Sequence, residues 1–338
     1  MAVDWMTMRN EWLARWIVLC LLAAAVSVPA VAWWQRSRGV VLQARIAESG
    51  GWTPENLAVA AGEPLRLRLT SEDVVHSFAI GQSDRPAVDV IPGEVAEVTL
   101  TFDKPGQYTF YCTRWCGLNH WRMRGVIEVS GPAAPESVEP PLYVTLGLDI
   151  DAEPHAETLP SRIPSAWRGA LLEKSIPAAY QTRQYYLAHT PQELWKDLRV
   201  ETRFEQRNDM EIWDLVAVVW QKNATPQEIA AGQQLYAVNC AACHGEQGRG
   251  DGVFAAELAH VDGKHSETAR AGPRGTQPTD FTNSRHMLAA SPARLQGKIV
   301  RGGMGTGMPY WGPIFTEDQT WALVAYLWSF QFELEKKP

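Results

Sequence analysis

The sequence lacks the features that would suit it to nucleic acid or give it a substrate-converting site. Its 31 Lys and Arg are outnumbered by 38 Asp and Glu, for a formal net charge of −7, which argues against a nucleic-acid partner. It has no low-complexity tract, and its 46% hydrophobic content is typical of globular domains. No Ser/His/Asp set, phosphate-binding loop or pair of catalytic carboxylates stands out. We therefore expect no catalytic residues on this chain.

Cysteine is scarce, and its spacing is informative. Only five cysteines occur among 338 residues: Cys20 in an apolar stretch, the pair Cys112 and Cys116, and the pair Cys240 and Cys243. Disulfides usually join distant segments, so close pairs followed by histidine indicate metal or haem chemistry instead. The length itself predicts two or three domains.

One stretch is long and apolar enough to suggest a membrane segment. Residues 16–34 carry no charge, and as a helix they would extend roughly 28 Å, about the thickness of a bilayer core. Trp16 and Trp34 lie at its two ends, as in the aromatic belts of membrane proteins. We expect a transmembrane anchor within an N-terminal segment 1–39. A cleaved signal peptide ending near residues 30–32 is the alternative.

The next part of the chain has the pattern of an all-β domain. Residues 65–69 and 96–102 alternate between apolar and polar side chains, and turn signals separate such runs. Several short strands at regular spacing predict a sandwich or barrel over residues 40–131. Residues 132–165 are rich in Pro, Glu and Ala, and we expect them to be a linker with little structure of its own.

The first cysteine pair belongs to a set of soft ligands. It lies in the run Cys112-Thr-Arg-Trp-Cys116-Gly-Leu-Asn-His120-Trp-Arg-Met123, and His76 lies upstream. Two thiolates, two imidazoles and a thioether suit copper. The spacing lets both sulfurs face a shared pair of metal ions while His120 and Met123 close on the same site. A zinc site is the alternative, which the methionine and the spacing disfavour.

The segment from Trp52 to Gly131 resembles the CuA-bearing cupredoxin domain of cytochrome c oxidase subunit II. The resemblance includes the run Asp89-Val-Ile-Pro-Gly-Glu94 as well as the cysteine loop. It implies a binuclear copper centre held by His76, Cys112, the backbone carbonyl of Arg114, Cys116, His120 and Met123. Most subunits II have Glu where Arg114 stands, which puts their magnesium site in doubt here. Arg114 and a single anchor are similar to B-type oxidases and CuA-containing nitric oxide reductases.

The second cysteine pair forms the run Cys240-Ala-Ala-Cys243-His244, which is the attachment signature of haem c. On a helix, both cysteines can form thioethers to the haem vinyls while His244 faces the iron. A redox dithiol or half of a zinc site is the alternative for a bare C-x2-C. The signature follows a capping box at residues 225–228, with Pro at the first helical position.

The order of motifs over residues 225–333 resembles a class I cytochrome c. The resemblance implies that Met308 is the distal haem ligand, with Met304 as the alternative. It also implies that the carbonyl of Pro278 orients the ring of His244.

The helical part of the chain contains an internal repeat. Residues 213–220 resemble residues 321–328, and a second capping box, at residues 190–193, precedes the earlier copy. The earlier copy has no haem signature. We interpret residues 166–222 as a haem-less relic of half a cytochrome domain; two ordinary amphipathic helices that share Trp and Val are the alternative.

These patterns predict a multi-domain chain. It has a single transmembrane helix, an all-β cupredoxin sandwich, and an all-α cytochrome c domain at residues 223–338 that follows the haem-less helical segment. We expect subunit II of a respiratory haem-copper oxidoreductase, the electron-input subunit of a cytochrome c oxidase. Because haem c is attached outside the cytoplasmic membrane, both redox domains would face the periplasm of a prokaryote.

The expected partners are a catalytic subunit I in the membrane and an electron donor such as a cytochrome c or a cupredoxin. Oxygen reduction is the expected reaction of the complex. A CuA-type nitric oxide reductase and a stand-alone anchored electron carrier are the alternatives.

Overall fold

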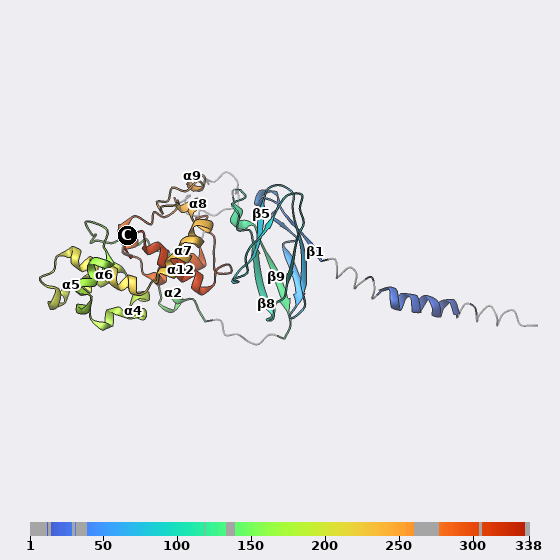
Figure 1. The fold of residues 1–338 in the computed structure, drawn as a ribbon, viewed down its shortest axis with the longest axis horizontal. Helices are drawn as coiled ribbons and strands as arrows, with labels where there is room; N and C mark the ends of the chain where they lie inside the picture. The colour runs from blue at the N-terminus through green and yellow to red at the C-terminus, as the bar shows by residue number, and fades with distance from the viewer. Residues whose placement is uncertain are drawn as a thin grey trace, which may run out of the picture.

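The structure is a computed structural model that describes residues 12, 15–28, 31, 39–117, 119–132, 139–259, 277–303 and 306–334. A β-sandwich and a helical domain lie side by side (Figure 1). Residues 15–28 are helical. None of the helices in the described ranges combines the length and apolar character needed to cross a bilayer. The expected anchor therefore stays a prediction, and part of its span lies outside the described residues.

The sandwich confirms the expected all-β domain. Alternation in β4 (Leu65–Ser71) buries Leu65, Leu67 and Leu69 and exposes Arg66 and Arg68, as a strand with one face on a core requires. One sheet has the strand order β2-β1-β4-β7 and the other β3-β9-β8-β5-β6. The other strands are β1 (Val40–Ala44), β2 (Trp52–Thr53), β3 (Asn56–Ala60), β5 (His76–Ile80), β6 (Val88–Val90), β7 (Ala96–Leu100), β8 (Gly106–Tyr111) and β9 (Arg124–Ser130).

An aromatic cluster fills the sandwich beside the cysteine loop. The ring of Trp52 lies 5.9 Å from the rings of both Phe78 and Phe110, in edge-to-face arrangements. Gly125 makes room for this cluster, because a Cβ atom there would collide with the ring of Phe110 and lie 2.5 Å from the carbonyl oxygen of Glu55. The core thereby fixes the strands from which the ligand loop extends.

Strand pairing brings distant ligands to one end of the sandwich. β5 begins at His76, β8 ends at Tyr111, and the two strands pair antiparallel. The start of β5 therefore lies beside the end of β8, where Cys112 follows directly. A turn of 3₁₀-helix, η2 (His120–Arg122), then leads the chain back into β9.

The rest of the described chain is helical. Both expected capping boxes are formed, by Thr190 with Glu193 and by Thr225 with Glu228, each with Pro at the first helical position. The 3₁₀ turn η1 (Ala47–Ser49) belongs to the sandwich. The helices and 3₁₀ turns that follow the sandwich are α2 (Leu142–Thr145), α3 (Ala166–Gly169), η3 (Ala170–Ser175), η4 (Ala178–Gln181), α4 (Arg183–Ala188), α5 (Pro191–Val200), η5 (Thr202–Phe204), α6 (Asp209–Lys222), α7 (Pro226–Asn239), α8 (Ala241–His244), α9 (Ala255–Ala259), α10 (Ser284–Met287), α11 (Pro292–Arg301) and α12 (Glu317–Trp328).

The two copies of the repeat form equivalent pairs of helices. α5 with α6 corresponds to α11 with α12, and the longer connection of the later copy contains Met308. Both copies belong to one continuous hydrophobic core, in which Trp220 and Trp328 meet edge to face at 5.7 Å. The expected border at residues 222/223 thus does not separate two cores. A common origin of the copies stays a prediction.

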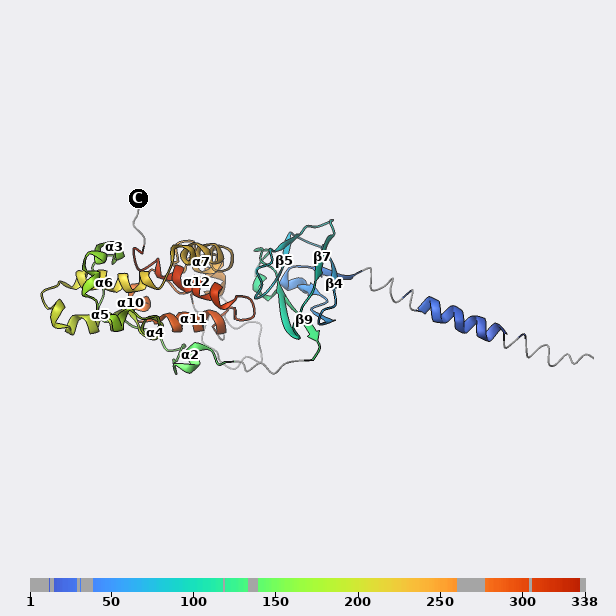
Figure 2. The same ribbon diagram turned by 60° about the horizontal axis from the view of Figure 1, so that its bottom comes forward.

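The spatial order of the segments differs from their order in the sequence. In both views, α4, α5 and α6 lie farthest from the sandwich, and α7 and α12 lie between them and the sandwich (Figures 1 and 2). The region of the haem-attachment signature therefore packs next to the β-sandwich, although residues 166–222, which have no such signature, precede it in the chain.

The second half of the expected linker is bound to the helical domain. Asp151 accepts hydrogen bonds from Lys298 at 3.0 Å and from Nη1 of Arg301 at 2.7 Å, both on α11. The backbone N–H of Ser165 donates to buried Asp214 at 2.7 Å. Residues 139–165 therefore have structure of their own, because basic side chains far along the chain pair with their acidic groups.

Candidate metal and haem sites

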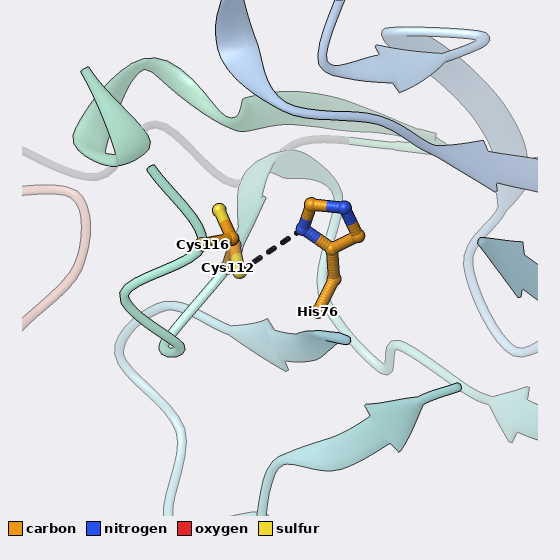
Figure 3. Close-up of side chains that lie close together, drawn as sticks. All are labelled: His76, Cys112 and Cys116. Carbon is orange, nitrogen blue, oxygen red and sulfur yellow. Dashed lines mark hydrogen bonds between the residues drawn. The ribbon is translucent and has the colours of Figure 1, made fainter. Parts of the chain in front are cut away.

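Three of the expected copper ligands meet at the end of the sandwich. The ligand atoms of His76, Cys112 and Cys116 all lie within 4.8 Å of one another (Figure 3). Nδ1 of His76 faces Sγ of Cys112 at 3.9 Å. The His76 side chain is fully buried and Cys112 is only 2% exposed. His76 and Cys112 are therefore shielded from solvent, whereas Cys116 is partly exposed.

The remaining expected ligands lie around this trio. Sδ of Met123 is 3.2 Å from Sγ of Cys116, and the carbonyl oxygen of Arg114 is 3.4 Å from Sγ of Cys112. His120 is buried, and its Nδ1 has no hydrogen-bond partner within the described part of the chain. A buried ring nitrogen without a partner is costly in a folded protein unless it serves as a ligand. The donor set present thus fits copper.

The two cysteines shift each other's pKa in opposite directions. A hydrogen bond from Cys116 lowers the pKa of Cys112 to about 2, against the opposing effect of burial and with support from His120 and His76. The same bond, together with burial, raises the pKa of Cys116. A metal that binds both sulfurs takes them as thiolates, so binding releases the proton of any thiol that is still protonated.

An acidic side chain outside the expected ligand set orients His76. Oδ1 of Asp73 accepts a hydrogen bond from Nε2 of His76 at 2.7 Å, which leaves Nδ1 free to face Cys112. Burial opposes ionisation of Asp73, but hydrogen bonds from the backbone N–H of Ile46, from His76 and from the backbone N–H of Val74 outweigh it and lower its pKa. Sequence reasoning missed Asp73, although an acidic residue three positions before a ligand histidine was a usable signal.

The side chain of Arg114 points away from the ligand loop. Its guanidinium donates to both carboxylate oxygens of Asp89, at 3.0 and 2.5 Å. This bidentate ion pair neutralises the charge of Asp89 and holds the Arg114 side chain away from the site. Only the backbone carbonyl of Arg114 faces Cys112.

The haem-attachment signature lies where α7 ends and α8 begins. Cys240 ends α7, and its carbonyl accepts hydrogen bonds from the backbone N–H groups of Cys243 and His244 at 3.1 and 2.9 Å. This turn keeps both sulfurs and the imidazole on one short segment. Burial raises the pKa of Cys240 to about 12 and that of Cys243 to about 11. A redox dithiol needs a lowered thiol pKa, so the burial of these thiols disfavours the alternative of a redox dithiol.

A backbone carbonyl orients His244, but it is not the expected one. Nδ1 of His244 lies 3.1 Å from the carbonyl oxygen of Thr279, the residue after Pro278. The carbonyl of Pro278 lies instead against Gly250, whose lack of a side chain permits the approach. The structure thus assigns this position to Thr279, one residue beyond the expectation. Burial lowers the pKa of His244, which favours the neutral imidazole that a metal ligand must be.

The expected distal ligand borders the same core as the attachment site. Met308 and Cys240 are both partly buried against the core that contains Trp220 and Trp328. Met304, the alternative ligand, lies outside the described residues. Phe281 stacks on the ring of His244 at 4.7 Å, so the imidazole has an apolar neighbour on one face. These residues provide two thiols, an imidazole and a thioether beside an apolar core, which fits a covalently attached haem.

A cupredoxin sandwich with Cys, His and Met ligands, joined to a helical domain with a haem signature, defines a two-domain class of electron-transfer protein. Residues 52–130 match the family model of the periplasmic domain of cytochrome c oxidase subunit II, and residues 229–331 match that of cytochrome c. The expected resemblance to a fusion of these two domains is confirmed, and with it the presence of copper and haem chemistry on one chain.

Individual relatives match the copper domain. Cytochrome c oxidase subunit 2 of Thermus thermophilus is 38% identical over 84 residues, which are 25% of this chain and 62% of that protein. The same subunit from a culture-collection strain of that species is also 38% identical over 84 residues, 25% of this chain but 49% of the relative. The chain thus spans 62% and 49% of the length of these two relatives.

Two solved structures are among the similar ones. The periplasmic domain of cytochrome oxidase subunit II of Bradyrhizobium japonicum is 28% identical, with a TM-score of 0.21, covering 23% of this chain and 55% of that one. A chain of a heme-copper terminal oxidase dimer is 23% identical, with a TM-score of 0.24, covering 36% of this chain and 99% of that one.

Proposed function

We propose that this chain is the electron-input subunit, subunit II, of a respiratory haem-copper oxidoreductase. Electrons enter through the cytochrome domain, pass to the copper domain and leave to a catalytic subunit I. The observation that carries the proposal is the convergence of the copper-ligand set at the end of the sandwich that faces the cytochrome domain. The chain itself converts no substrate.

The copper domain binds a two-copper centre. Cys112 and Cys116 would supply thiolates to the two ions, His76 and His120 would supply imidazoles, and Met123 and the carbonyl of Arg114 would complete the set. Such a centre, when bound, exchanges single electrons with little change in geometry. The chain contributes rigidity, because the ligands extend from paired strands and buried turns. Trp52 adds to this by donating a hydrogen bond to the Met123 carbonyl at 3.2 Å.

The cytochrome domain binds one haem c. Cys240 and Cys243 would form the thioethers to the haem, and His244 and Met308 would supply an imidazole and a thioether to its iron. Ligation by His and Met gives a haem, when bound, a fairly high reduction potential. The Thr279 carbonyl holds the proximal imidazole in one orientation.

The N-terminal segment anchors the chain in the inner membrane of a prokaryote, with both redox domains on the periplasmic side. Residues 15–28 are helical, and their large apolar side chains are more than half exposed in this chain alone. A helix that exposes apolar side chains around its circumference suits a lipid environment. These exposed residues are Trp16, Ile17, Val18, Leu19, Leu21, Leu22, Val26 and Val28.

The complex reduces oxygen, and its donor is a cytochrome c or a cupredoxin. A nitric oxide reductase is the second candidate. It is favoured by Arg114, which stands where most subunits II have Glu and whose side chain pairs with Asp89. The deciding experiment compares oxygen and nitric oxide consumption by the purified complex. Consumption of nitric oxide alone would overturn the oxidase assignment. Loss of turnover after removal of subunit I is expected, and its persistence would place the reaction on this chain.

Ligand variants test the two sites separately. Met123→Leu is expected to change the visible and near-infrared copper bands, and unchanged bands would remove Met123 from the ligand set. Met308→Ala is expected to abolish the low-spin six-coordinate haem spectrum. If that spectrum persisted, Met304 would take its place.

A further inference from the structure

Two groups of contacts join the copper domain and the cytochrome domain. In the first group, the backbone N–H of Gln82 donates to the carbonyl of Ile314 at 2.6 Å, and the Gln82 side chain donates to the carbonyl of Gly312 at 2.7 Å. Nη1 of Arg124 donates to the carbonyl of Tyr310 at 2.8 Å on the same connection between α11 and α12. These contacts hold the connection that contains Met308 against the sandwich.

The second group of contacts is made by the side chain of Trp115. Trp115 lies between the two cysteines of the copper-ligand loop. Its indole N–H donates to the carbonyl of Val238 at 2.7 Å, on α7 two residues before Cys240. Its ring lies 4.3 Å from the ring of His120 and 5.3 Å from that of Phe254, in the loop between α8 and α9. One indole thus touches a copper ligand, the haem-attachment helix and an aromatic ring of the cytochrome domain.

We propose that Trp115 is the electronic bridge between the cytochrome domain and the copper centre. The proposal rests on the function proposed above and names the residue through which its internal electron step passes. In that step one electron leaves the cytochrome domain and one is gained by the copper domain. No bond forms or breaks and no proton needs to move.

The bonding pattern around Trp115 favours it over the other contacts. Electronic coupling through a protein falls steeply with each through-space gap, whereas hydrogen bonds and packed rings keep gaps short. Trp115 is bonded directly to Cys116, packs on His120, and reaches the helix of Cys240 through one hydrogen bond. In the described part of the chain, the hydrogen bonds of Gln82 go to Gly312 and Ile314, not to an expected ligand, and they dock the domains. Arg124 follows the expected ligand Met123 and reaches the carbonyl of Tyr310 through one hydrogen bond, but unlike Trp115 it offers no aromatic ring packed on a copper-ligand histidine.

The test uses the full chain loaded with copper and haem. Trp115→Leu removes the ring and the hydrogen bond, and Trp115→Phe keeps an aromatic ring but not the N–H. Trp167→Leu, on α3 and 47% exposed, is the matched control for loss of a surface indole. One electron is injected with a photoactivated reductant, and the rate of electron exchange between haem and copper is followed by their absorption bands.

Two further readouts separate coupling from docking and from loading. Hydrogen exchange at the Gln82 amide reports docking, because that N–H is bonded to Ile314 across the interface. The copper and haem spectra report that both sites are loaded. The expected result is a several-fold slower exchange rate in Trp115→Leu, a smaller loss in Trp115→Phe and none in Trp167→Leu, with unchanged spectra and Gln82 protection.

An unchanged rate in Trp115→Leu would overturn the proposal. So would a slower rate that appears only together with loss of Gln82 protection, since the domains would then have separated. Failure of the proposed function would look different: the unmodified chain would not load both groups, or would show no electron exchange between them.

Discussion

Removal of the Asp73 carboxylate should weaken copper binding without touching a ligand. Asp73 holds Nε2 of His76 at 2.7 Å and thereby turns Nδ1 toward Cys112. In metalloproteins, loss of such a partner of a ligand histidine costs about 10- to 100-fold in metal affinity, or about 1.4–2.8 kcal/mol. We expect Asp73→Ala to lie in this range. Asp73→Asn should lose less, because its amide oxygen can still accept from His76.

The assay is titration of copper into the metal-free chain against a competing chelator, followed by the visible absorption of the copper–thiolate centre. Glu72→Ala is the matched control. It removes the adjacent carboxylate, whose partner is Arg45 at 2.6 Å rather than a copper ligand, so copper affinity should not change. If Asp73→Ala bound copper as tightly as the unmodified chain, the hydrogen bond to His76 would have no part in building the site. An equal loss in Glu72→Ala would show a general effect of charge instead.

Asp73 also predicts a pH dependence. Its pKa is lowered in the folded chain, because hydrogen bonds to the carboxylate outweigh its burial. A carboxyl with a lowered pKa stabilises the fold above its ordinary pKa, and that contribution is lost as pH falls through the folded-state value. The stability difference between the unmodified chain and Asp73→Asn should therefore shrink on acidification. A difference that grew toward low pH would contradict this sign.

Three further predictions concern the helical domain. The double variant Cys240→Ala/Cys243→Ala should lose covalent haem, seen as absence of haem stain on a denaturing gel; retained stain would place the attachment elsewhere. Asp214→Ala should cost about 3 kcal/mol in urea unfolding, because it removes the bidentate partner of the partly buried Arg168 guanidinium, which keeps its hydrogen bonds to Glu333 and the Ile163 carbonyl, and leaves a buried backbone N–H without its acceptor. A loss below about 1 kcal/mol would mean that the ion pair is no better than a surface one. Hydrogen bonds from the two basic side chains of α11 lower the pKa of Asp151, so the advantage of the unmodified chain over Asp151→Asn in thermal melts should be full above the ordinary carboxyl pKa of about 4 and shrink progressively as pH falls below it toward the lowered folded-state pKa. An advantage that did not shrink in acid would contradict a stabilising role of this ion pair.

The features that the sequence predicted are those encoded locally. His120 and Met123 follow Cys116 within one loop, so their spacing alone brings them back to the sulfurs. Alternation in residues 65–69 and the capping boxes depend on neighbouring residues, and the structure forms both. The approach of His76 to Cys112 depends on strand pairing, and for that ligand the family resemblance carried the prediction.

The features that the sequence did not predict depend on contacts between distant segments. Whether the carbonyl of Pro278 or that of Thr279 faces His244 depends on the local path of the backbone, because carbonyls of neighbouring residues point in different directions. The structure has the Thr279 carbonyl at His244. Residues 139–165 are polar and Pro-rich, but α11, about 150 residues later, supplies the cations that bind them. The position of Trp115 against α7 likewise arises only when the two domains dock.

The two-copper centre is tested most directly by the metal and haem content of the purified chain, combined with electron paramagnetic resonance of its copper. We expect two coppers for each covalent haem, and a hyperfine pattern from one unpaired electron shared by two equivalent copper nuclei. One copper for each haem, with the pattern of a single copper nucleus, would contradict the two-copper centre at Cys112 and Cys116.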